Sequence, residues 1–341
     1  MEEPFVSIII PVRNEIQYIS RCLQAVANQD YPVDRVEVLV ADGASDDGTT
    51  EFLHSWASQG SDRSVFLNPG RIVPTGLNIL IPRAKGEVII RVDGHCVIAP
   101  DYVSDCVCHL QGGEADGVGG PMCSIGEDII SQVTALAMSS KFGVGNSSFR
   151  TESGVTKYTD TVPFPAYTRK IIEKVGLYDE ELVRNQDDEY NYRIREAGGR
   201  ILLAEDVKSE YFSRGSLRKL WKQYFQYGYW KVRVLQKHPR QMSPRQFVPL
   251  GFVLGLILTS LLSLFTPWGW KTLIALAVVY LAANFTASMI TAWGKGCKKM
   301  ALLPLAFGII HLSYGLGFLA GLFKFRNRWR DKKGLVPDWQ P

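Results

Sequence analysis

The sequence predicts an α/β domain with a mainly parallel sheet flanked by helices, followed by a C-terminal region of membrane helices. Three observations lead to this prediction. In the first 100 residues, apolar β-branched stretches alternate with stretches of helical periodicity. Residues 1–210 hold 32 Asp and Glu against 19 Lys and Arg, whereas residues 211–341 hold 2 against 19. Three apolar runs of 19 or more residues lie in this basic part.

The expected strands and helices alternate along the first 94 residues. Strands are predicted at residues 5–12, 36–45, 64–68 and 86–94. Helices are predicted at residues 13–29, 46–56 and 76–84. In sheets built this way, polar residues just past the carboxyl ends of the strands line the ligand crevice. The residues in that position are Asn14, Glu15, Asp42 and Asp93.

The predicted crevice is acidic. The first strand-to-helix turn reads PVRNE and lacks the G-x-G-x-x-G pattern of dinucleotide-binding enzymes, which argues against a dehydrogenase. Carboxylates repel phosphate unless a cation lies between them. The stretch RVDGH places Asp93 two residues before His95 at the end of the fourth strand. Manganese accepts both ligand types, so the pair is a candidate metal site, although D-x-H alone is also compatible with a surface turn.

Three apolar runs in the basic part reach the length that a helix needs to cross a bilayer. They cover residues 247–265, 272–293 and 301–323. Lys and Arg precede the first run and follow the second and third, and three full crossings cannot place all of them on one side of a membrane. We therefore favour a re-entrant or interfacial third run, which Pro304, His311 and four glycines interrupt.

The N-terminal half is expected to lie in the cytoplasm. The start, MEEPF, has no basic stretch followed by an apolar core, as a cleaved signal peptide would have. The six cysteines are scattered without a C-x-x-C pair, which agrees with reduced thiols. Cys106, Cys108 and His109 offer ligand types suited to zinc, but CVCHL is typical of a helix, so a zinc site is the weaker interpretation.

Four motifs together resemble a known family. SIIIPVRNE, VADGASDDGT, RVDGH and NQDDEYNYRIREAGG occur in the order and approximate spacing of family 2 inverting glycosyltransferases with the GT-A fold. The resemblance covers about residues 4–235. The apolar runs and the QYFQYGYWK segment are most similar to the bacterial exopolysaccharide branch typified by the succinoglycan glucosyltransferase.

The resemblance implies a UDP-sugar site at the strand ends. The residues implied to contact the donor nucleotide are Pro11, Asn14, Glu15, Asp42, Arg71, Asn78 and Asp93. Asp42 would accept a hydrogen bond from the uracil ring, and the alternative is a plain turn aspartate. Asp46 and Asp47 are alternatively explained as caps of the helix that follows.

The family usually has D-x-D where this sequence has Asp93, Gly94 and His95. The resemblance implies that Asp93 contacts ribose or metal, and that His95 replaces the second aspartate as a ligand of Mn²⁺ or Mg²⁺. This replacement removes one negative charge from the site, so we expect manganese to be favoured.

The stretch NQDDEYNYR matches the place where the family has Glu-Asp before a helix, with Gln186 replacing the glutamate. Asp187 then aligns with the catalytic base that takes the proton of the acceptor hydroxyl, and direct displacement at an α-linked donor gives a β-linkage. Asp188 and Glu189 are adjacent, which leaves open a base one residue away. A structural alternative is that the three acids stabilise a helix N-terminus.

Residues 217–235 are predicted to form an amphipathic helix in the membrane interface, with basic side chains meeting anionic lipid headgroups. In related synthases, a Gln-containing motif that ends in Trp closes over the donor and contacts the acceptor. The nearest equivalents here are Gln223, Tyr224 and Trp230, with Asp188 as a further candidate for this role. Tyr and Gly replace the usual Arg before Trp, and plain membrane anchoring is the alternative.

The predicted segments are a catalytic domain at 1–210, an interfacial helix region at 211–246, membrane helices at 247–323 and a basic tail at 324–341. We expect a multi-pass or partly re-entrant protein of the cytoplasmic membrane that adds a sugar from a UDP-sugar to a lipid-linked saccharide, in exopolysaccharide or cell-surface glycan assembly. Its expected partners include membrane lipids but no nucleic acid.

Two alternatives stay open. A processive polysaccharide synthase would need a membrane channel, for which two or three spans are too few unless the protein oligomerises. A membrane-anchored nucleotide-binding protein without catalysis would show loss of the base or the metal ligands. Gln186 and His95 are departures of that kind, whereas Asp93 and Asp187 are retained.

Overall fold

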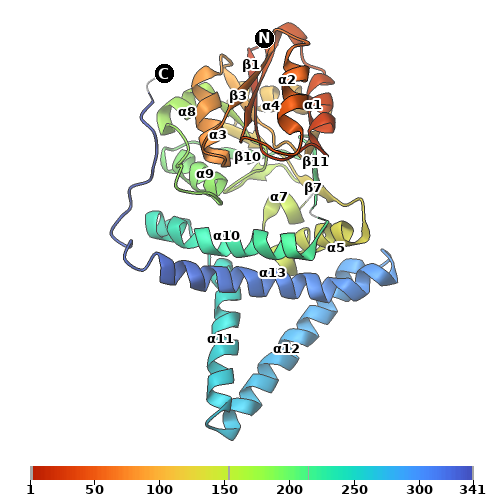
Figure 1. The fold of residues 1–341 in the computed structure, drawn as a ribbon, viewed down its shortest axis with the longest axis vertical. Helices are drawn as coiled ribbons and strands as arrows, with labels where there is room; N and C mark the ends of the chain where they lie inside the picture. Colours follow the sequence, from red (N-terminus) through yellow and green to blue (C-terminus); the bar gives the residue numbers. More distant parts are fainter. Residues whose placement is uncertain (1–2, 153, 214, 340–341) are drawn as a thin grey trace. The chain divides into compact units, whose positions relative to one another are not determined.

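The computed structural model describes residues 3–152, 154–213 and 215–339, with the backbone alone at residues 297 and 298. The chain divides into two compact units, each described below by itself (Figure 1). The sheet unit contains residues 1–123, 152–211 and 334–341. The helical unit contains residues 124–151 and 212–333. A short C-terminal segment therefore groups with the N-terminal part of the chain.

A mixed eight-stranded sheet forms the centre of the sheet unit, in the order β3–β2–β1–β4–β9–β6–β10–β8. Its strands are β1 (Val6–Val12), β2 (Val36–Asp42), β3 (Arg63–Leu67), β4 (Val88–Arg91), β6 (Gly117–Gly119), β8 (Lys157–Tyr158), β9 (Ala166–Thr168) and β10 (Ile201–Leu203). Strand β1 pairs in parallel with β2 and β4, whereas β9 is antiparallel to both of its neighbours. The predicted mixed, mainly parallel sheet is thus confirmed.

Helices cover this sheet, and short strands extend the unit. The helices are α1 (Ile19–Ala27), α2 (Thr49–Ala57), α3 (Val73–Leu80), α4 (Tyr102–Gln111), α8 (Arg169–Val175) and α9 (Gln186–Glu196). The short strands β5 (Cys96–Ile98), β11 (Ser209–Phe212) and β7 (Met122–Ile125) form a second sheet in the order β5–β11–β7. The expected alternation of strand and helix is observed, with element ends shifted by a few residues.

The first helix shows why one boundary differs from the prediction. Strand β1 is buried at all seven positions, and Ser7 is the polar residue in it. Helix α1 starts at Ile19 rather than residue 13, because Asn14 has a positive φ of 56° and the Glu15 carbonyl accepts from Tyr18 and Ile19 in a turn. The apolar residues at helical spacing therefore begin before the helix itself, in the turn that follows β1.

The helical unit consists of helices joined by short connections. They are α5 (Ile129–Met138), α6 (Lys141–Val144), α7 (Ser148–Thr151), α10 (Leu217–Lys237), α11 (Val248–Ser263), α12 (Pro267–Ala292) and α13 (Cys297–Lys324). Within this unit, α10 and α13 run side by side, and α11 and α12 project away from them (Figure 1). Close packing of α10 on α13 depends on glycine: a Cβ at Gly228 would lie 2.1 Å from the Tyr314 carbonyl oxygen, and one at Gly317 would lie 2.0 Å from that of Phe225.

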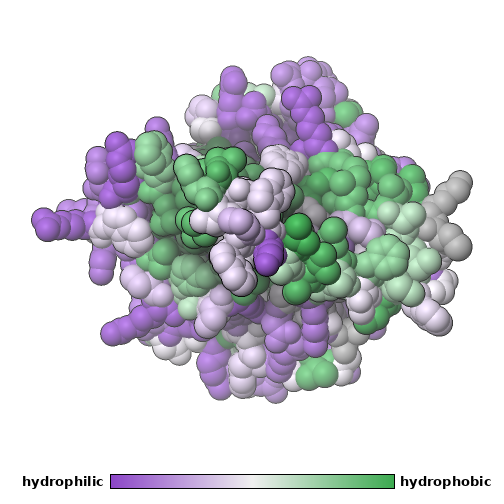
Figure 2. Space-filling view, turned by 90° about the horizontal axis from the view of Figure 1, so that it is seen from below, coloured by the Kyte–Doolittle hydropathy of each residue, from purple (hydrophilic) through white to green (hydrophobic). Residues whose placement is uncertain are grey.

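Three segments are long and apolar enough to cross a membrane: Pro244–Ser263, Pro267–Ala292 and Lys299–Lys324. In the first two, only 6% and 11% of the most apolar window is buried, against 44% in the third. Apolar side chains of α11 and α12 are correspondingly exposed, and green apolar surface gathers near the centre of the face in Figure 2. Helix α13 packs along α10, and whether its apolar run crosses a membrane or lies along its interface stays a prediction.

Polar side chains within the apolar helices are paired. The Tyr280 hydroxyl of α12 lies 3.0 Å from His311 Nδ1 of α13, and His311 Nε2 lies 2.8 Å from the Phe142 carbonyl oxygen. Asn284 donates to the Pro304 carbonyl at 3.0 Å. These bonds satisfy groups whose exposure to lipid would be costly.

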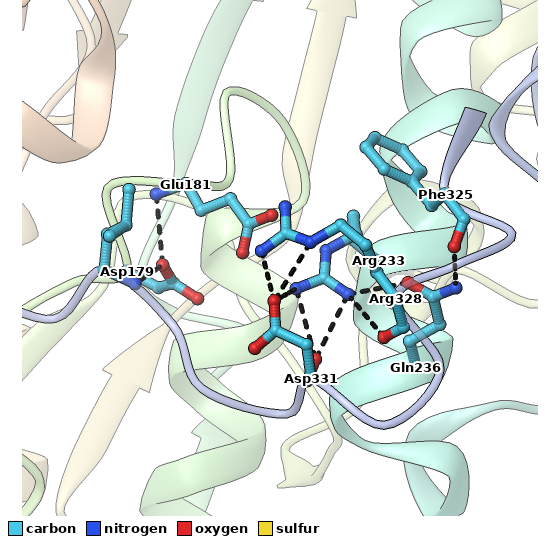
Figure 3. Close-up of polar contacts among 8 residues, drawn as sticks. Asp179, Glu181, Arg233, Gln236, Phe325, Arg328 and Asp331 are labelled. Carbon is cyan, nitrogen blue, oxygen red and sulfur yellow. Dashed lines mark hydrogen bonds and ion pairs between the residues drawn. The ribbon is translucent and has the colours of Figure 1, made fainter.

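The end of α13 is fixed by a buried arginine of α10 (Figure 3). Arg233 is fully buried and donates to Gln236 Oε1 at 2.6 Å and to the carbonyl oxygens of Arg328 and Asp331 at 3.3–3.4 Å. Gln236 in turn donates to the Phe325 carbonyl at 2.8 Å. The chain that leaves α13 is therefore held by hydrogen bonds from α10.

Candidate active site

The candidate residues lie at one edge of the sheet. In the parallel ladder, Val12 of β1 is opposite Asp42 of β2, and Ile9 of β1 is opposite Arg91 of β4. The turns that follow these strands therefore begin at neighbouring positions, as expected for the carboxyl ends of parallel strands. They carry Asn14 and Glu15 after β1, and Asp93 after β4.

Asp42 is tied into its own turn. Its side chain is 2% exposed. One carboxylate oxygen accepts from the Ser45 hydroxyl at 2.6 Å, and the other accepts from the Thr50 hydroxyl at 2.5 Å. These bonds give Asp42 a structural task in the turn before α2, and its contact with a uracil ring stays a prediction.

The first two turns are joined by amide and carboxylate groups. Asn14 Nδ2 donates to Asp46 Oδ1 at 2.8 Å, and the Asp46 backbone N–H donates back to Asn14 Oδ1 at 3.0 Å. Asp47 accepts from the backbone N–H of Thr49, the first residue of α2, and from that of Ile16. Asp47 thus supports the start of α2, whereas Asp46 links the turn to Asn14.

Three further predicted nucleotide contacts have different surroundings. Pro11 is buried in β1 opposite Ala41. Arg71 is exposed, in a turn with a φ of 58°. Asn78 is 8% exposed, and its amide accepts from the Tyr178 N–H at 2.8 Å and donates to the Tyr178 carbonyl at 2.9 Å. The Asn78 amide is therefore engaged by the loop before α9, and its nucleotide contact stays a prediction.

Arg91 brings two of the predicted residues together. It is the last residue of β4 and is 5% exposed. Its Nε and Nη2 donate to Asp93 Oδ1 at 3.1 and 2.9 Å, and its Nη1 donates to Asp187 Oδ1. A planar guanidinium holds two carboxylates in this way with defined geometry. Sequence reasoning did not single out Arg91, although a charged residue inside the run GEVIIRVDG is a detectable signal.

The two carboxylates differ in their protonation equilibria. Burial opposes the ionisation of Asp93, but the charges of Arg91 and His95 outweigh it and hold the pKa of Asp93 below its ordinary value. Partial removal from water raises the pKa of Asp187 above its ordinary value, and the charge of Arg91 offsets this only in part. Asp187 is therefore the more basic carboxylate of the pair, which suits a proton acceptor.

His95 faces Glu15. His95 Nδ1 lies 2.9 Å from Glu15 Oε1, and the two side chains are 13% and 12% exposed. The imidazole also packs edge-on against Tyr211, with ring centroids 4.9 Å apart. In the described part of the chain, this buried Nδ1 has no hydrogen-bond partner of good geometry. A buried nitrogen next to a carboxylate is a donor set that fits a divalent cation such as manganese.

A self-contained metal cage is absent from the described residues, where no three His, Cys, Asp or Glu side chains are grouped to hold an ion. The weaker zinc interpretation gains no support: Cys106 is buried and Cys108 exposed on α4, and His109 Nε2 lies 2.9 Å from Asp206.

The acids at the start of α9 have separate tasks. Glu189 is 2% exposed and forms an ion pair with Arg193 at 2.8 Å, one turn later. Asp187, with 37% of its side chain exposed, pairs with Arg91 instead. Gln186 is 5% exposed, and its Oε1 lacks a hydrogen-bond partner among the residues the structure describes. Position and exposure thus favour Asp187 over Glu189 as a base.

The predicted acceptor residues of α10 belong to the helical unit. Gln223 Nε2 donates to the Tyr227 hydroxyl at 3.1 Å. Tyr224 is 6% exposed and packs edge-on against Tyr227, with ring centroids 5.5 Å apart. Trp230 packs on Phe325, with ring centroids 5.7 Å apart. Trp230 therefore contributes to the packing of this unit, and the acceptor role of all three predicted residues, like that of Asp188, stays a prediction.

The sequence is similar to those of known glycosyltransferases over most of its length. The model of the family described as "Glycosyl transferase family 2" matches residues 7–176. The succinoglycan biosynthesis protein ExoA of Rhizobium meliloti is 30% identical over 94% of this chain and 96% of its own length. A dolichyl N-acetyl-α-D-glucosaminyl phosphate 3-β-D-2,3-diacetamido-2,3-dideoxy-β-D-glucuronosyltransferase of Methanococcus voltae is 26% identical over 94% of this chain and 98% of its own.

A solved structure has a similar fold. The mannosyltransferase PcManGT from Pyrobaculum calidifontis, in complex with GDP-Man and Mn²⁺, superposes with a TM-score of 0.58. It is 22% identical, and the match covers 95% of this chain and 88% of that one. At this identity the likeness concerns the fold alone.

Proposed function

The chain belongs to glycosyl transferase family 2 and has the GT-A fold, and on this premise we propose that it is an inverting enzyme that transfers a sugar from a UDP-sugar to a lipid-linked saccharide with a β-linkage. The observation that carries the proposal is the Arg91 bridge between Asp93 and Asp187. Asp93 comes from the motif on the donor side of the family resemblance, and Asp187 comes from the position of the base. The Arg91 guanidinium thus holds a carboxylate of the proposed donor site next to the proposed base.

Asp187 is the proposed general base. The acceptor hydroxyl must lose its proton as it attacks the anomeric carbon, and a positioned carboxylate removes it. The raised pKa of Asp187 strengthens it as a base, while its bond to Arg91 fixes the direction of the carboxylate. Attack opposite the departing diphosphate inverts the anomeric centre. Orientation of this kind contributes a large part of the rate of a bimolecular transfer.

His95 and Asp93 are the residues that would hold a divalent cation, with Glu15 beside them. When bound, Mn²⁺ or Mg²⁺ supplies positive charge for the departing diphosphate. Independently of the cation, Arg91 keeps Asp93 ionised in a crevice where burial opposes its charge. The side chains of this chain thus orient the donor and accept the proton.

The helical unit supports a lipid-linked acceptor and a place in exopolysaccharide or cell-surface glycan assembly. Helices α11 and α12 have the length and exposure of a pair of membrane crossings. If α13 stays along α10, the basic residues before α11, between α12 and α13, and after α13 fall on one side. The positive-inside rule then assigns this side to the cytoplasm, where the nucleotide sugar is made available. A relative whose name includes a dolichyl phosphate acceptor agrees with this substrate class.

Calorimetric titration of UDP into the detergent-solubilised protein tests the proposal. We expect binding with Mn²⁺ that weakens strongly when EDTA is in excess, and weaker binding of GDP under the same conditions. Equal binding of GDP would redirect the donor assignment to another nucleotide. Absence of binding by both nucleotides with Mn²⁺ would contradict the donor site, and the crevice would need another ligand.

A further inference from the structure

A segment near the C-terminus contributes to the sheet unit. The backbone N–H of Leu335 donates to Asp179 Oδ1 at 2.8 Å, and the backbone N–H of Glu180 donates to the Leu335 carbonyl at 2.9 Å. Asp179 is 156 residues away in the sequence, and its side chain is 1% exposed. The same Asp179 oxygen accepts from the Glu181 N–H at 3.0 Å, which closes a turn (Figure 3). Leu335 therefore donates to a buried carboxylate that also organises its own loop.

The contact is made by backbone atoms. The Leu335 side chain is 64% exposed, so its apolar surface does not account for the contact. A Cβ at Gly334 would lie 2.4 Å from Asp179 Oδ2 and 2.6 Å from Asp179 Cγ. Because the buried Asp179 side chain is short and cannot swing away, only glycine allows this approach. Gly334 and Leu335 therefore contact the Asp179 turn through specific backbone interactions and not through apolar side-chain packing.

The Asp179 turn lies in the loop that leads to α9. On one side, the amide of Asn78 in α3 holds both backbone groups of Tyr178. On the other, the Tyr178 ring stacks on Tyr190 of α9, with centroids 3.9 Å apart and a plane angle of 10°. Arg193 of α9 donates to the carbonyls of Val175 and Leu177 at 2.7 and 2.8 Å. This loop is therefore a rigid link between α3, the C-terminal segment and α9.

The position of Asp187 depends on this link. Asn185, the residue before α9, adopts a left-handed conformation with a φ of 63°, so the chain turns sharply just before the proposed base. Movement of the 178–185 loop would shift the first turn of α9, and with it the Asp187 carboxylate. A displacement of about 1 Å in a catalytic group is enough to lower a rate by about 100-fold.

We propose that Gly334–Leu335 is a positioning element of the active site. Its backbone completes the Asp179 turn, which fixes the loop before α9 and so sets the place of Asp187. This inference rests on the proposed transfer reaction, in which Asp187 is the base. Neither Gly334 nor Leu335 touches the reacting groups, and their effect passes through the loop.

The test compares Leu335→Pro with Leu335→Ala in the full-length detergent-solubilised protein. Proline removes the N–H that Asp179 accepts, whereas alanine keeps both backbone groups and removes only an exposed side chain. In Leu335→Pro we expect faster amide hydrogen exchange over residues 176–190, a kcat at least tenfold lower and a donor KM within twofold of the wild type. Leu335→Ala should match the wild type in all three.

Gly334→Ala provides a second variant should Leu335→Pro fold poorly, because its Cβ displaces the segment without removing an N–H. Unchanged exchange in both disruptive variants would overturn the inference, as would faster exchange with an unchanged kcat. Failure of the wild type to transfer sugar would instead overturn the proposed function. The exchange comparison needs no activity, so it still decides whether the segment orders the loop.

Discussion

Two buried arginines, one in each unit, show how differently the same side chain is used. Arg91 is 5% exposed and binds the carboxylates of Asp93 and Asp187. Arg233 is fully buried and binds mainly the backbone carbonyls of Arg328 and Asp331 and the amide of Gln236. Burial alone therefore does not distinguish the two arginines, whereas the groups they bind do.

The difference has a physical basis. Arg233 donates mainly to backbone carbonyls, which do not titrate, and so fixes the end of α13; the Asp331 carboxylate lies further away, with its Oδ2 3.8 Å from Arg233 Nη2. Carboxylates change protonation state, so Arg91 controls both the geometry and the pKa of its partners. The contacts of Arg233 stabilise the fold, whereas those of Arg91 set the position and the pKa of two carboxylates.

The largest expected effect concerns the partner of Arg91 on α9. Asp187→Asn keeps the shape of the side chain and removes its basicity, so transfer should fall by about 10²–10⁴-fold, the usual contribution of a general base. Binding of UDP should stay within about threefold of the wild type, because the base is on the acceptor side. Single-turnover transfer and calorimetry measure the two quantities.

Asp188→Asn is the matched control for this variant, because it makes the same chemical change one residue later. We expect a smaller loss of transfer than in Asp187→Asn, because the role predicted for Asp188 is contact with the acceptor and not removal of its proton. A loss in Asp188→Asn together with full activity in Asp187→Asn would move the base by one residue and remove the catalytic meaning of the Arg91 bridge.

Arg91→Lys sharpens the comparison by keeping the charge and removing the planar fork. One ammonium cannot hold both carboxylates in the same geometry, so kcat should fall by about 10–100-fold. Asp187 must be ionised to act, so activity falls as the pH drops through its pKa. Arg91 lowers that pKa, and weakening the contact should therefore move the acid limb of the pH–kcat profile to higher pH. An acid limb at the same pH as in the wild type would contradict the effect of Arg91 on the pKa of Asp187. Arg195→Lys, which changes an exposed arginine of α9, is the control.

A smaller effect is expected at the neighbouring D-x-H motif. His95→Asp restores two carboxylates and adds a negative charge, which should improve use of Mg²⁺ and lower the ratio of Mn²⁺- to Mg²⁺-supported activity by about tenfold. Metal titrations of initial rates measure the ratio. Equal activity of the wild type with both metals at micromolar concentration would count against His95 as a ligand.

The smallest effect on chemistry is expected at the structural arginine. Arg233→Met removes a buried donor to Gln236 Oε1 and to the Asp331 carbonyl, so the free energy of unfolding should fall by about 2 kcal/mol while kcat per folded molecule stays unchanged. Arg328→Met is the control, since Arg328 pairs with Asp331 at the surface and should cost at most about 1 kcal/mol. Thermal unfolding and active-site titration separate the outcomes, and a loss of kcat in Arg233→Met would erase the distinction between the two arginines.

The sequence predicted what depends on local pattern. The placement of Asp93 follows from a strand end, whereas Asp187 was identified only by the family resemblance, and the roles of both stay predictions. Strands such as β1 and β4 follow from apolar β-branched runs, and the three long apolar helices follow from length and composition. In each case the physical cause, burial or backbone preference, acts over a few residues and leaves a periodic trace.

Contacts between distant segments left no such trace. The partners Arg91 and Asp187 are 96 residues apart, and nothing in either local pattern encodes the pairing. Residues 124–151 carry the short apolar helix α5, whose grouping with the C-terminal helices was not predicted. Asn78 illustrates the same limit, because its buried amide binds a loop about 100 residues later. The contacts of Arg91, α5 and Asn78 depend on segments that are distant in the sequence and adjacent only in the folded chain.

The Gly334–Leu335 segment also sets an order of events during biosynthesis. Most of the sheet unit leaves the ribosome first, and N-terminal domains generally fold in that order. The two backbone hydrogen bonds with Leu335 form only after α11, α12 and α13 have been translated. A nascent chain that is interrupted within these three helices lacks them, so the loop before α9 gains its last two hydrogen bonds only after all three helices have been made.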